Sequence, residues 1–321
     1  MLHVRVTVPA DLTEQVLDEL SSDPAVSSLA VLRGAALQPL GDVILADIAR
    51  EAANEIIDAL DRLGVPECGT VHVEPVTTWV SRRGYEAERS TPGASADAVV
   101  WAEVTHRAYR ETELNWTYLA FMTLATVLAS IAIVVDSQIL VIGAMVLGPE
   151  FVAISALGLA LVRHRGSLFG TALRTLAVGF GVAIAASTVL SLIARGLGWV
   201  VVEDVTGQRP ETAFIYTPDK WSFIVAIIAA AAGVLSLTSA KVGGLSGVFI
   251  SVTTVPAAGN IALALAFTQW SEVVGSSAQL ALNVSGMALA GWFTLFVQQR
   301  VWNRKAAHRA RLLKGSGRTE G

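Results

Sequence analysis

The chain has 321 residues, and only 16% of them are charged, well below the roughly 25% of an average soluble domain. Residues 1–114 carry 9 basic and 19 acidic side chains, residues 115–299 carry 7 of each, and residues 300–321 carry 7 basic and 1 acidic. These numbers exclude a single soluble globule, a disordered chain and a collagen-like fibre, and the single cysteine, Cys68, excludes a disulfide framework or a cysteine-rich metal site.

The first 80 residues predict an α+β domain. Residues 2–8 alternate apolar and polar side chains, which is the period of a half-buried strand, and further strands are expected over about 25–33, 42–48 and 70–76. Asp11 is expected to cap a first helix, and apolar residues at helical spacing around 56–63 predict a second. The order βαββαβ is that of ferredoxin-like domains.

Two functions are open for this N-terminal domain. Its fold is similar to that of the small regulatory modules called ACT domains, which favours the sensing of a small molecule, whereas the plainer alternative is a structural or oligomerisation cap. The sequence contains no glycine-rich phosphate loop and no metal-ligand cluster there, so we expect no cofactor and no metal. Its excess of acidic residues also disfavours nucleic acid as a partner.

Residues 81–114 are expected to connect this domain to the membrane. The stretch 81–96 is rich in turn-forming residues and predicts a linker. Asp97 is expected to cap an amphipathic helix whose apolar side includes Trp101 and Val104. Such a helix can lie at the level of the lipid headgroups or pack under the N-terminal domain, and the sequence leaves both open.

The body of the chain predicts an α-helical membrane domain. Apolar runs long enough to span a bilayer lie at about 115–135, 137–162, 168–194, 221–240, 244–268 and 276–299. Basic residues follow the second, fourth and sixth runs, including Arg163, Lys241 and the tail 300–321. By the positive-inside rule, both termini are expected in the cytoplasm of a multi-pass plasma-membrane protein, with the basic tail near anionic lipid.

The six predicted spans divide into two similar halves. Trp116 opens the first span and Trp221 the fourth, and a helix-interrupting proline follows each of them, Pro149 after 33 residues and Pro256 after 35. Three spans per half is an odd number, so the second half would enter the membrane from the opposite side, as a 3+3 inverted repeat. Proline breaks a helix, and the freed backbone groups must then face protein or water. Paired breaks in inverted halves indicate the binding site of a transporter.

Glu150 is the strongest candidate at these breaks. A charged acid near the middle of a span costs about 2.5–3.5 kcal/mol on insertion scales. Directly after Gly148 and Pro149 it would open a new half-helix, whose dipole stabilises a carboxylate. Glu150 is therefore expected to bind a cation or carry a proton; the alternative is a protonated side chain bonded to a neighbouring helix.

Polar residues surround the second break as well. Thr253, Thr254 and Asn260 could contact an ion or solute, or could simply heal the kink by bonding to the backbone. In the hairpins between paired spans, polar side chains either gate the site or end helices. The predicted substrate or ion site comprises Gly148, Pro149, Glu150, Thr253, Thr254, Pro256 and Asn260, and the hairpin or gating set comprises Asp136, Ser137, Ser239 and Lys241.

Two of these segments resemble a known family. The stretch Val-Ile-Gly143-Ala-Met-Val-Leu-Gly148-Pro149, preceded by Asp136-Ser137, resembles the hallmark of the membrane proteins classed as domain of unknown function 389. The stretch from Lys241 to Asn260 is similar to the second segment of that family in its actinobacterial branch. The chain departs from the broader pattern at Ala153, near which the resemblance implies a second proline. The resemblance supports the membrane fold and implies no substrate.

These observations predict a transporter or channel-like protein for a small solute or ion, which contacts membrane lipids and forms a homo-oligomer. The alternative is a membrane-anchored sensor or scaffold whose cytoplasmic domain binds a small molecule. The spans contain no Gly-x-Ser-x-Gly and no His-Glu-x-x-His pattern, so we do not expect an enzyme.

Overall fold

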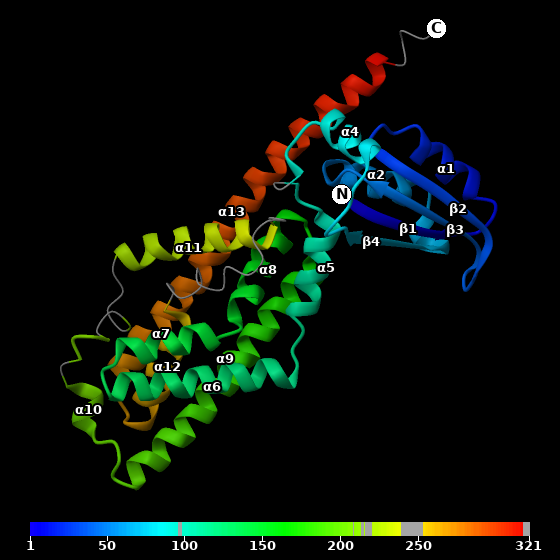
Figure 1. The fold of residues 1–321 in the computed structure, drawn as a ribbon. Helices are drawn as coiled ribbons and strands as arrows, with labels where there is room; N and C mark the ends of the chain where they lie inside the picture. Colours follow the sequence, from blue (N-terminus) through cyan, green and yellow to red (C-terminus); the bar gives the residue numbers. More distant parts are fainter. Residues whose placement is uncertain (96–97, 208, 213–214, 216–219, 239–252, 317–321) are drawn as a thin grey trace. The chain divides into compact units, whose positions relative to one another are not determined.

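The computed structural model describes residues 1–321 except 96–97, 208, 213–214, 216–219, 239–252 and 317–321 (Figure 1). The chain forms two compact units. The first contains Met1–Val104 together with the described residues from Gln298 onward. The second contains most of the described residues between Thr105 and Val297.

A four-stranded antiparallel sheet forms the centre of the first unit. Its strands are β1 (Leu2–Val8), β2 (Val26–Leu37), β3 (Leu40–Ile48) and β4 (Thr70–Pro75), arranged in the order β2-β3-β1-β4 (Figure 1). Helix α1 (Thr13–Ser21) follows β1, and the 3-10 helix η1 (Arg50–Ala52), α2 (Ala53–Arg62) and the short α3 (Val65–Cys68) follow β3. The predicted succession of strands and helices is therefore present.

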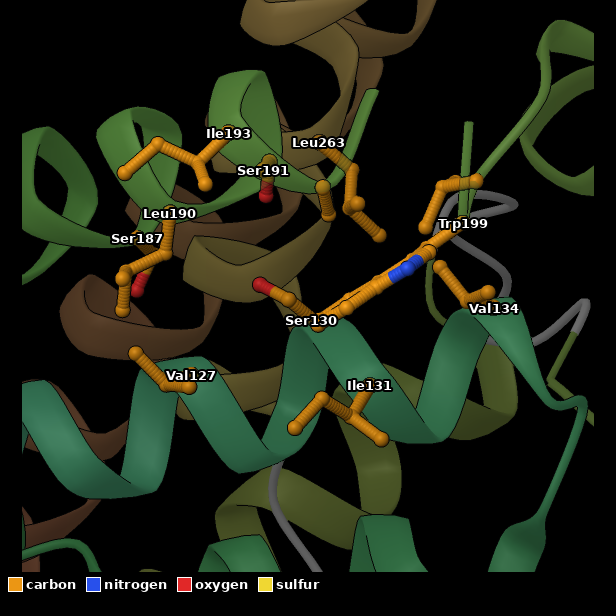
Figure 2. A pocket seen from close by; sticks show the side chains of 12 residues that line it. Val127, Ser130, Ile131, Val134, Ser187, Leu190, Ser191, Ile193, Trp199 and Leu263 are labelled. Atoms are coloured by element: carbon orange, nitrogen blue, oxygen red, sulfur yellow. The ribbon is translucent and has the colours of Figure 1, made fainter. Parts of the chain in front are cut away.

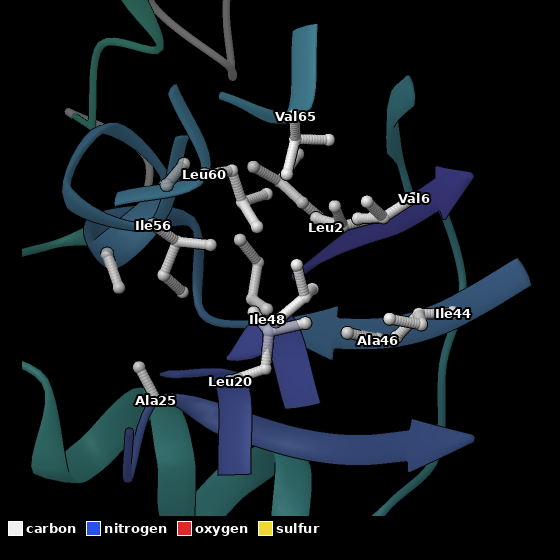
Figure 3. Packing of buried hydrophobic residues seen from close by; sticks show 14 of the residues in the cluster. Leu2, Val6, Leu20, Ala25, Ile44, Ala46, Ile48, Ile56, Leu60 and Val65 are labelled. Atoms are coloured by element: carbon white, nitrogen blue, oxygen red, sulfur yellow. The ribbon is translucent and has the colours of Figure 1, made fainter. Parts of the chain in front are cut away.

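One face of this sheet carries the core. Alternate residues of β1 point to the same side, so Leu2 and Val6 are both buried there, as the period of a strand requires. Leu20 from α1 and Ile56 and Leu60 from α2 pack against them (Figure 3). The amphipathic pattern of the sequence thus placed both helices on the apolar face of the sheet.

Two local predictions for the first unit were wrong. Asp11 does not cap α1: the chain turns through a hydrogen bond from the Leu12 N–H to the Pro9 carbonyl oxygen (3.1 Å), which puts Leu12 at the N-cap position. The stretch predicted as a linker contains helix α4 (Arg82–Ser90). Ser81 caps this helix by accepting a hydrogen bond from the Gly84 N–H at 3.1 Å, and the charged residues that follow are good helix formers.

The segment before helix α5 (Trp101–Glu111) packs against the N-terminal domain. Val100 belongs to the core of the sheet domain. The Asn54 side chain on α2 donates to the Val99 carbonyl oxygen (2.7 Å) and accepts from the Trp101 N–H (3.0 Å). Of the two placements that the sequence left open, the start of this helix therefore takes the packed one.

The second unit is helical. Its elements are α6 (Trp116–Val134), α7 (Gln138–Leu147), α8 (Glu150–Val162), α9 (Gly166–Gly196), α10 (Val202–Thr206), α11 (Lys220–Thr238), α12 (Thr254–Ala266) and α13 (Trp270–Ser316), the last of which continues into the first unit (Figure 1). Within the described residues, α6, α9 and α13 are long and apolar enough to cross a membrane. The pair α7 and α8, bent by 56°, makes a fourth candidate, and α11 and α12 contribute shorter apolar helices.

The outer surfaces of these helices support a membrane location. Leu124 on α6, Val189 on α9 and Phe293 on α13 are each more than half exposed. Large apolar side chains exposed on several neighbouring helices would be unfavourable in water and are stable in lipid. The protein is therefore a membrane protein with at least three candidate spans. The predicted fifth span is described from residue 253 onward, and its first part, residues 244–252, lies outside the described residues.

The helices of this unit recur at one spacing. The first residues of α6 and α11, of α8 and α12, and of α9 and α13 are each 104 positions apart; α6 and α11 have 19 residues each, and α8 and α12 have 13 each. The turns that follow α8 and α12 also match. His164 and Thr268, again 104 positions apart, adopt positive φ angles of 51° and 57°.

Candidate functional site

The predicted break at Pro149 is present. Helix α7 ends at Leu147, Gly148 adopts an extended conformation (φ −66°, ψ 123°), and Pro149 is the N-cap of α8. Proline has no N–H to donate, so it fits a position that lies outside the hydrogen-bond ladder of a helix. Glu150 is the first residue of α8, as the sequence predicted. Its carboxylate therefore lies at the positive end of the helix dipole.

The second helix start differs from the first. Helix α12 begins at Thr254, with Thr253 as its N-cap, so Pro256 lies inside the first turn. The N–H groups of the first turn have no partner within the helix, which is why proline is accepted there. The spacing of 104 pairs Pro149 with Thr253 and Glu150 with Thr254, rather than one proline with the other.

The two helix starts are in direct contact. The Thr254 hydroxyl donates a hydrogen bond of 2.6 Å to Glu150 Oε1. Both side chains are buried, with exposed fractions of 1% for Thr254 and 7% for Glu150. Gly148 makes this possible, because a Cβ atom there would lie 2.7 Å from Val255 Cγ2 and 3.0 Å from Glu150 Cδ. Three predicted site residues thus meet, although more than 100 positions separate the two segments.

The other carboxylate oxygen of Glu150 is the unusual atom of this contact. Within the part of the chain that the structure describes, Glu150 Oε2 is buried and has no hydrogen-bond partner. The same holds for the hydroxyl of Tyr118 on α6, whose ring lies against Gly179 on α9. A buried acceptor without a partner is costly, and more so when it carries charge. Glu150 can therefore take up a proton or a cation.

Asn260, the third predicted polar residue on α12, lies in a different cluster. It is fully buried; its amide donates to Ser276 Oγ (2.8 Å) and to Glu272 Oε2 (3.0 Å), and its oxygen accepts from Arg209 Nη1 (3.2 Å). Arg209 Nη2 lies 2.9 Å and 3.0 Å from the two oxygens of Glu272. A paired and hydrogen-bonded arginine is the form in which a buried guanidinium is stable.

A row of polar side chains on α13 joins this cluster to the second helix start. We call Glu272, Ser276, Gln279 and Asn283 the polar strip; their spacing of four, three and four positions places them on one face of the helix. Gln279 is fully buried and donates to Asn283 Oδ1 (3.4 Å), and Asn283 donates to Thr253 Oγ1 (3.1 Å). The strip is about 16 Å long at 1.5 Å per residue.

Sequence reasoning missed Arg209 and the whole polar strip. The signal was available, because polar side chains recur at helical spacing within the last predicted span. It was overlooked because three of the four residues are uncharged and do not lower the mean hydropathy of the span enough to be noticed.

The hairpin residues have structural contacts. Ser137 caps α7 by accepting from the Leu140 N–H (3.4 Å). Asp136 has a positive φ of 44° and accepts hydrogen bonds from the Thr212 hydroxyl (2.8 Å) and the Glu211 N–H (3.3 Å). These two residues therefore end and begin helices and hold the segment that follows α10. Ser239 and Lys241 lie outside the described residues.

A cavity of about 360 Å³ lies beside these contacts without including them. Helices α6, α9 and α12 line it, with Trp199 at one side (Figure 2). Its walls are mostly aliphatic, and the side chains with polar atoms are those of Ser130, Ser187, Ser191 and Trp199. Ser130 also donates to the Gly259 carbonyl oxygen (3.1 Å). Glu150 and Thr254 are not among its lining residues.

Among the described residues, no group of three or more His, Cys, Asp or Glu side chains could hold a metal ion. The family model described as Domain of unknown function (DUF389) matches residues 145–289, which include both helix starts and the polar strip. No curated protein and no solved structure was found that matches the chain.

Proposed function

We propose that this chain, which belongs to the DUF389 family through residues 145–289, is a membrane transporter or channel-like protein for a small solute or ion. The observation that carries the proposal is the contact between Glu150 and Thr254 at two helix starts, where one buried carboxylate oxygen has no partner among the described residues. Helix starts that meet inside a membrane domain are the kind of place where transporters bind their ligands.

The proposal includes a six-span domain built as an inverted repeat. The constant spacing of 104 positions and the equal lengths of corresponding helices support the repeat. The packing of the short helices supports it too, because each packs on the other half. Helix α12 contacts α6 and α9. Helix α8 crosses α13 at Gly158, where a Cβ atom would lie 2.7 Å from the backbone nitrogen of Trp292. Two repeats that interlock in this way can enclose a site between them.

The proposed orientation places both termini in the cytoplasm of a plasma-membrane protein. The distribution of basic residues supports it, since Arg163, Arg165, Lys241 and the tail 300–321 would then all lie on one side. In this orientation the Arg209–Glu272 pair lies toward the outer surface. A homo-oligomer is part of the proposal as the common state of such proteins.

The test is solute and ion flux through the purified full chain in liposomes. Glu150→Gln keeps the size of the side chain and its contact with Thr254 but removes the charge. We expect flux to fall about tenfold or more, which corresponds to about 1.4 kcal/mol in a barrier. Thr254→Val, which removes the hydroxyl donor, should also lower it. The matched control is Glu203→Gln, which neutralises an exposed acid on α10.

Equal flux in wild type and Glu150→Gln would refute the role of the carboxylate. If wild type transports no ion or solute, and a small molecule raises the unfolding temperature of the N-terminal domain in the full chain, the protein is a sensor or scaffold instead.

A further inference from the structure

The charges along the polar strip decide what it can carry. At its outer end, Glu272 is neutralised by Arg209, with both carboxylate oxygens within 3.0 Å of Nη2. The side chains that follow, from Ser276 to Thr254, are uncharged amides and hydroxyls. The row ends at Glu150, whose carboxylate is the one formal charge at the inner end among the residues that the structure describes. The net charge of the row is therefore −1 when Glu150 is ionised.

We propose that the polar strip is the path of a small monovalent cation, a proton or an alkali ion, to Glu150. This inference rests on the proposed function and names its ligand class. One cation of charge +1 neutralises the single carboxylate and removes the cost of a charge buried in the membrane. A divalent ion would leave an uncompensated charge, since such ions are usually held by more than one carboxylate. An anion would be repelled by Glu150.

Two side-chain oxygens of this row bear on the choice between a cation and an anion. Within the described residues, Glu150 Oε2 and Gln279 Oε1 are buried and accept no hydrogen bond. Three donors along the row are used: the Thr254 hydroxyl on Glu150, the Gln279 amide on Asn283, and the Asn283 amide on Thr253. Oxygens of carboxylate and amide groups are the ligands that replace the water of a small hard cation. Oxygens that accept no hydrogen bond therefore favour a cation over an anion.

The size and position of the strip agree with this ligand. Its length of about 16 Å is roughly half of the ~30 Å hydrocarbon core, so a row that starts near one interface ends near the midplane. Trp270, which opens α13 and is 66% exposed, is the kind of residue that lies at that interface. Thr254 and Glu150 are in contact, so the inner end has no room for a bulky solute.

The experiment measures dissipation of single gradients by the full chain in liposomes. Separate samples carry a Na⁺, a K⁺ or a pH gradient, and two further samples carry chloride or glycerol. We expect at least one cation gradient to collapse in wild type, and the sample that responds identifies the ion. Gln279→Leu and Asn283→Leu should each slow it about tenfold or more. Ser187→Ala removes a buried hydroxyl of α9 that lies outside the strip and should leave the rate unchanged.

A second measurement tests the inference even if the leucine variants do not fold. In detergent, Na⁺, K⁺ or a lowered pH should raise the unfolding temperature of wild type relative to choline at neutral pH, because a ligand stabilises the state that binds it. Glu150→Gln should lose this shift. If chloride or glycerol crosses and no cation does, the inference is overturned while the proposed function stands. If no gradient is dissipated, both fail.

Discussion

Two glycines, Gly143 inside α7 and Gly148 at its C-cap, allow a direct test of the contact between the helix starts. At Gly148, a Cβ atom would lie 2.7 Å from Val255 Cγ2 and 3.0 Å from Glu150 Cδ, closer than packed atoms approach. At Gly143, the nearest atom to a Cβ would be Leu128 Cδ2 at 3.8 Å, which is an ordinary contact. The backbone of Gly148 has φ −66° and ψ 123°, which alanine adopts freely. The two alanine variants therefore differ in packing at the helix starts and not in backbone strain.

The expected energies have opposite signs. Overpacking by one methyl group should make Gly148→Ala less stable by about 1–3 kcal/mol. Gly143 lies inside a helix, where alanine is favoured over glycine by about 1 kcal/mol, so Gly143→Ala should be neutral or stabilising. The free energies of unfolding of the two variants should thus differ by about 1–4 kcal/mol.

The assay is equilibrium unfolding of the full chain in detergent micelles, with wild type and both variants measured side by side. Combining Gly148→Ala with Glu150→Ala should restore part of the loss, because the carboxyl group that the new methyl group meets is then absent. A double-mutant cycle should give a coupling of about 0.5 kcal/mol or more. If the two glycine variants change stability equally, or if the cycle shows no coupling, the close approach of Gly148 to Glu150 is refuted.

Three further predictions concern other contacts. At Gly259, a Cβ atom would lie 2.8 Å from a side-chain carbon of α6, so Gly259→Ala should lower the free energy of unfolding by about 1–3 kcal/mol. Stabilisation in the same micelle assay would contradict the close crossing of α12 and α6. Arg309→Gln breaks the ion pair of the buried Arg309 with the N-terminal domain and should speed hydrogen exchange in the last turns of α13. Arg304→Gln, at an exposed position, should leave the exchange unchanged. Equal exchange in both variants would refute the pairing. Hydrogen bonds from the Gly34 N–H and the Thr13 hydroxyl hold the pKa of Asp42 below its usual range, so their stabilisation is present above the unfolded pKa of about 3.9 and is lost as the pH falls through the folded pKa. Thr13→Val should flatten the fall in unfolding temperature of the strands, followed by circular dichroism, between about pH 5 and about pH 2, and an unchanged slope would refute the role of the hydroxyl.

Two half-buried acids of the N-terminal domain link it to the end of α13. Arg309 is 6% exposed and pairs with Asp23 and with Glu55, the latter at 3.4 Å. Burial raises the pKa of the Glu55 carboxyl, and Arg309 opposes that rise. The basic tail, which the sequence suggested as a lipid anchor, therefore contributes at least one residue to the N-terminal domain itself.

The sequence by itself determined the local features of this protein. Alternating side chains gave the strands of the N-terminal domain, apolar runs gave the membrane helices, and Pro149 gave the end of α7 with Glu150 opening α8. Each depends on the nature of residues within one or two turns, because periodicity and the missing N–H of proline act at short range. The same local reasoning was wrong at α4, where Ser81 favours the start of a helix and Gly84 favours a turn.

Only the tertiary structure decided which of these features form a site. The hydrogen bond between Thr254 and Glu150 joins residues 104 positions apart, and the cluster of Arg209, Asn260 and Glu272 joins three separate segments. Such pairs are set by how helices cross, at places where a glycine lets two backbones or a side chain approach closely. No local pattern encodes a crossing. The sequence could therefore single out Glu150, but only the packing shows which of its oxygens is bonded and which has no partner among the described residues.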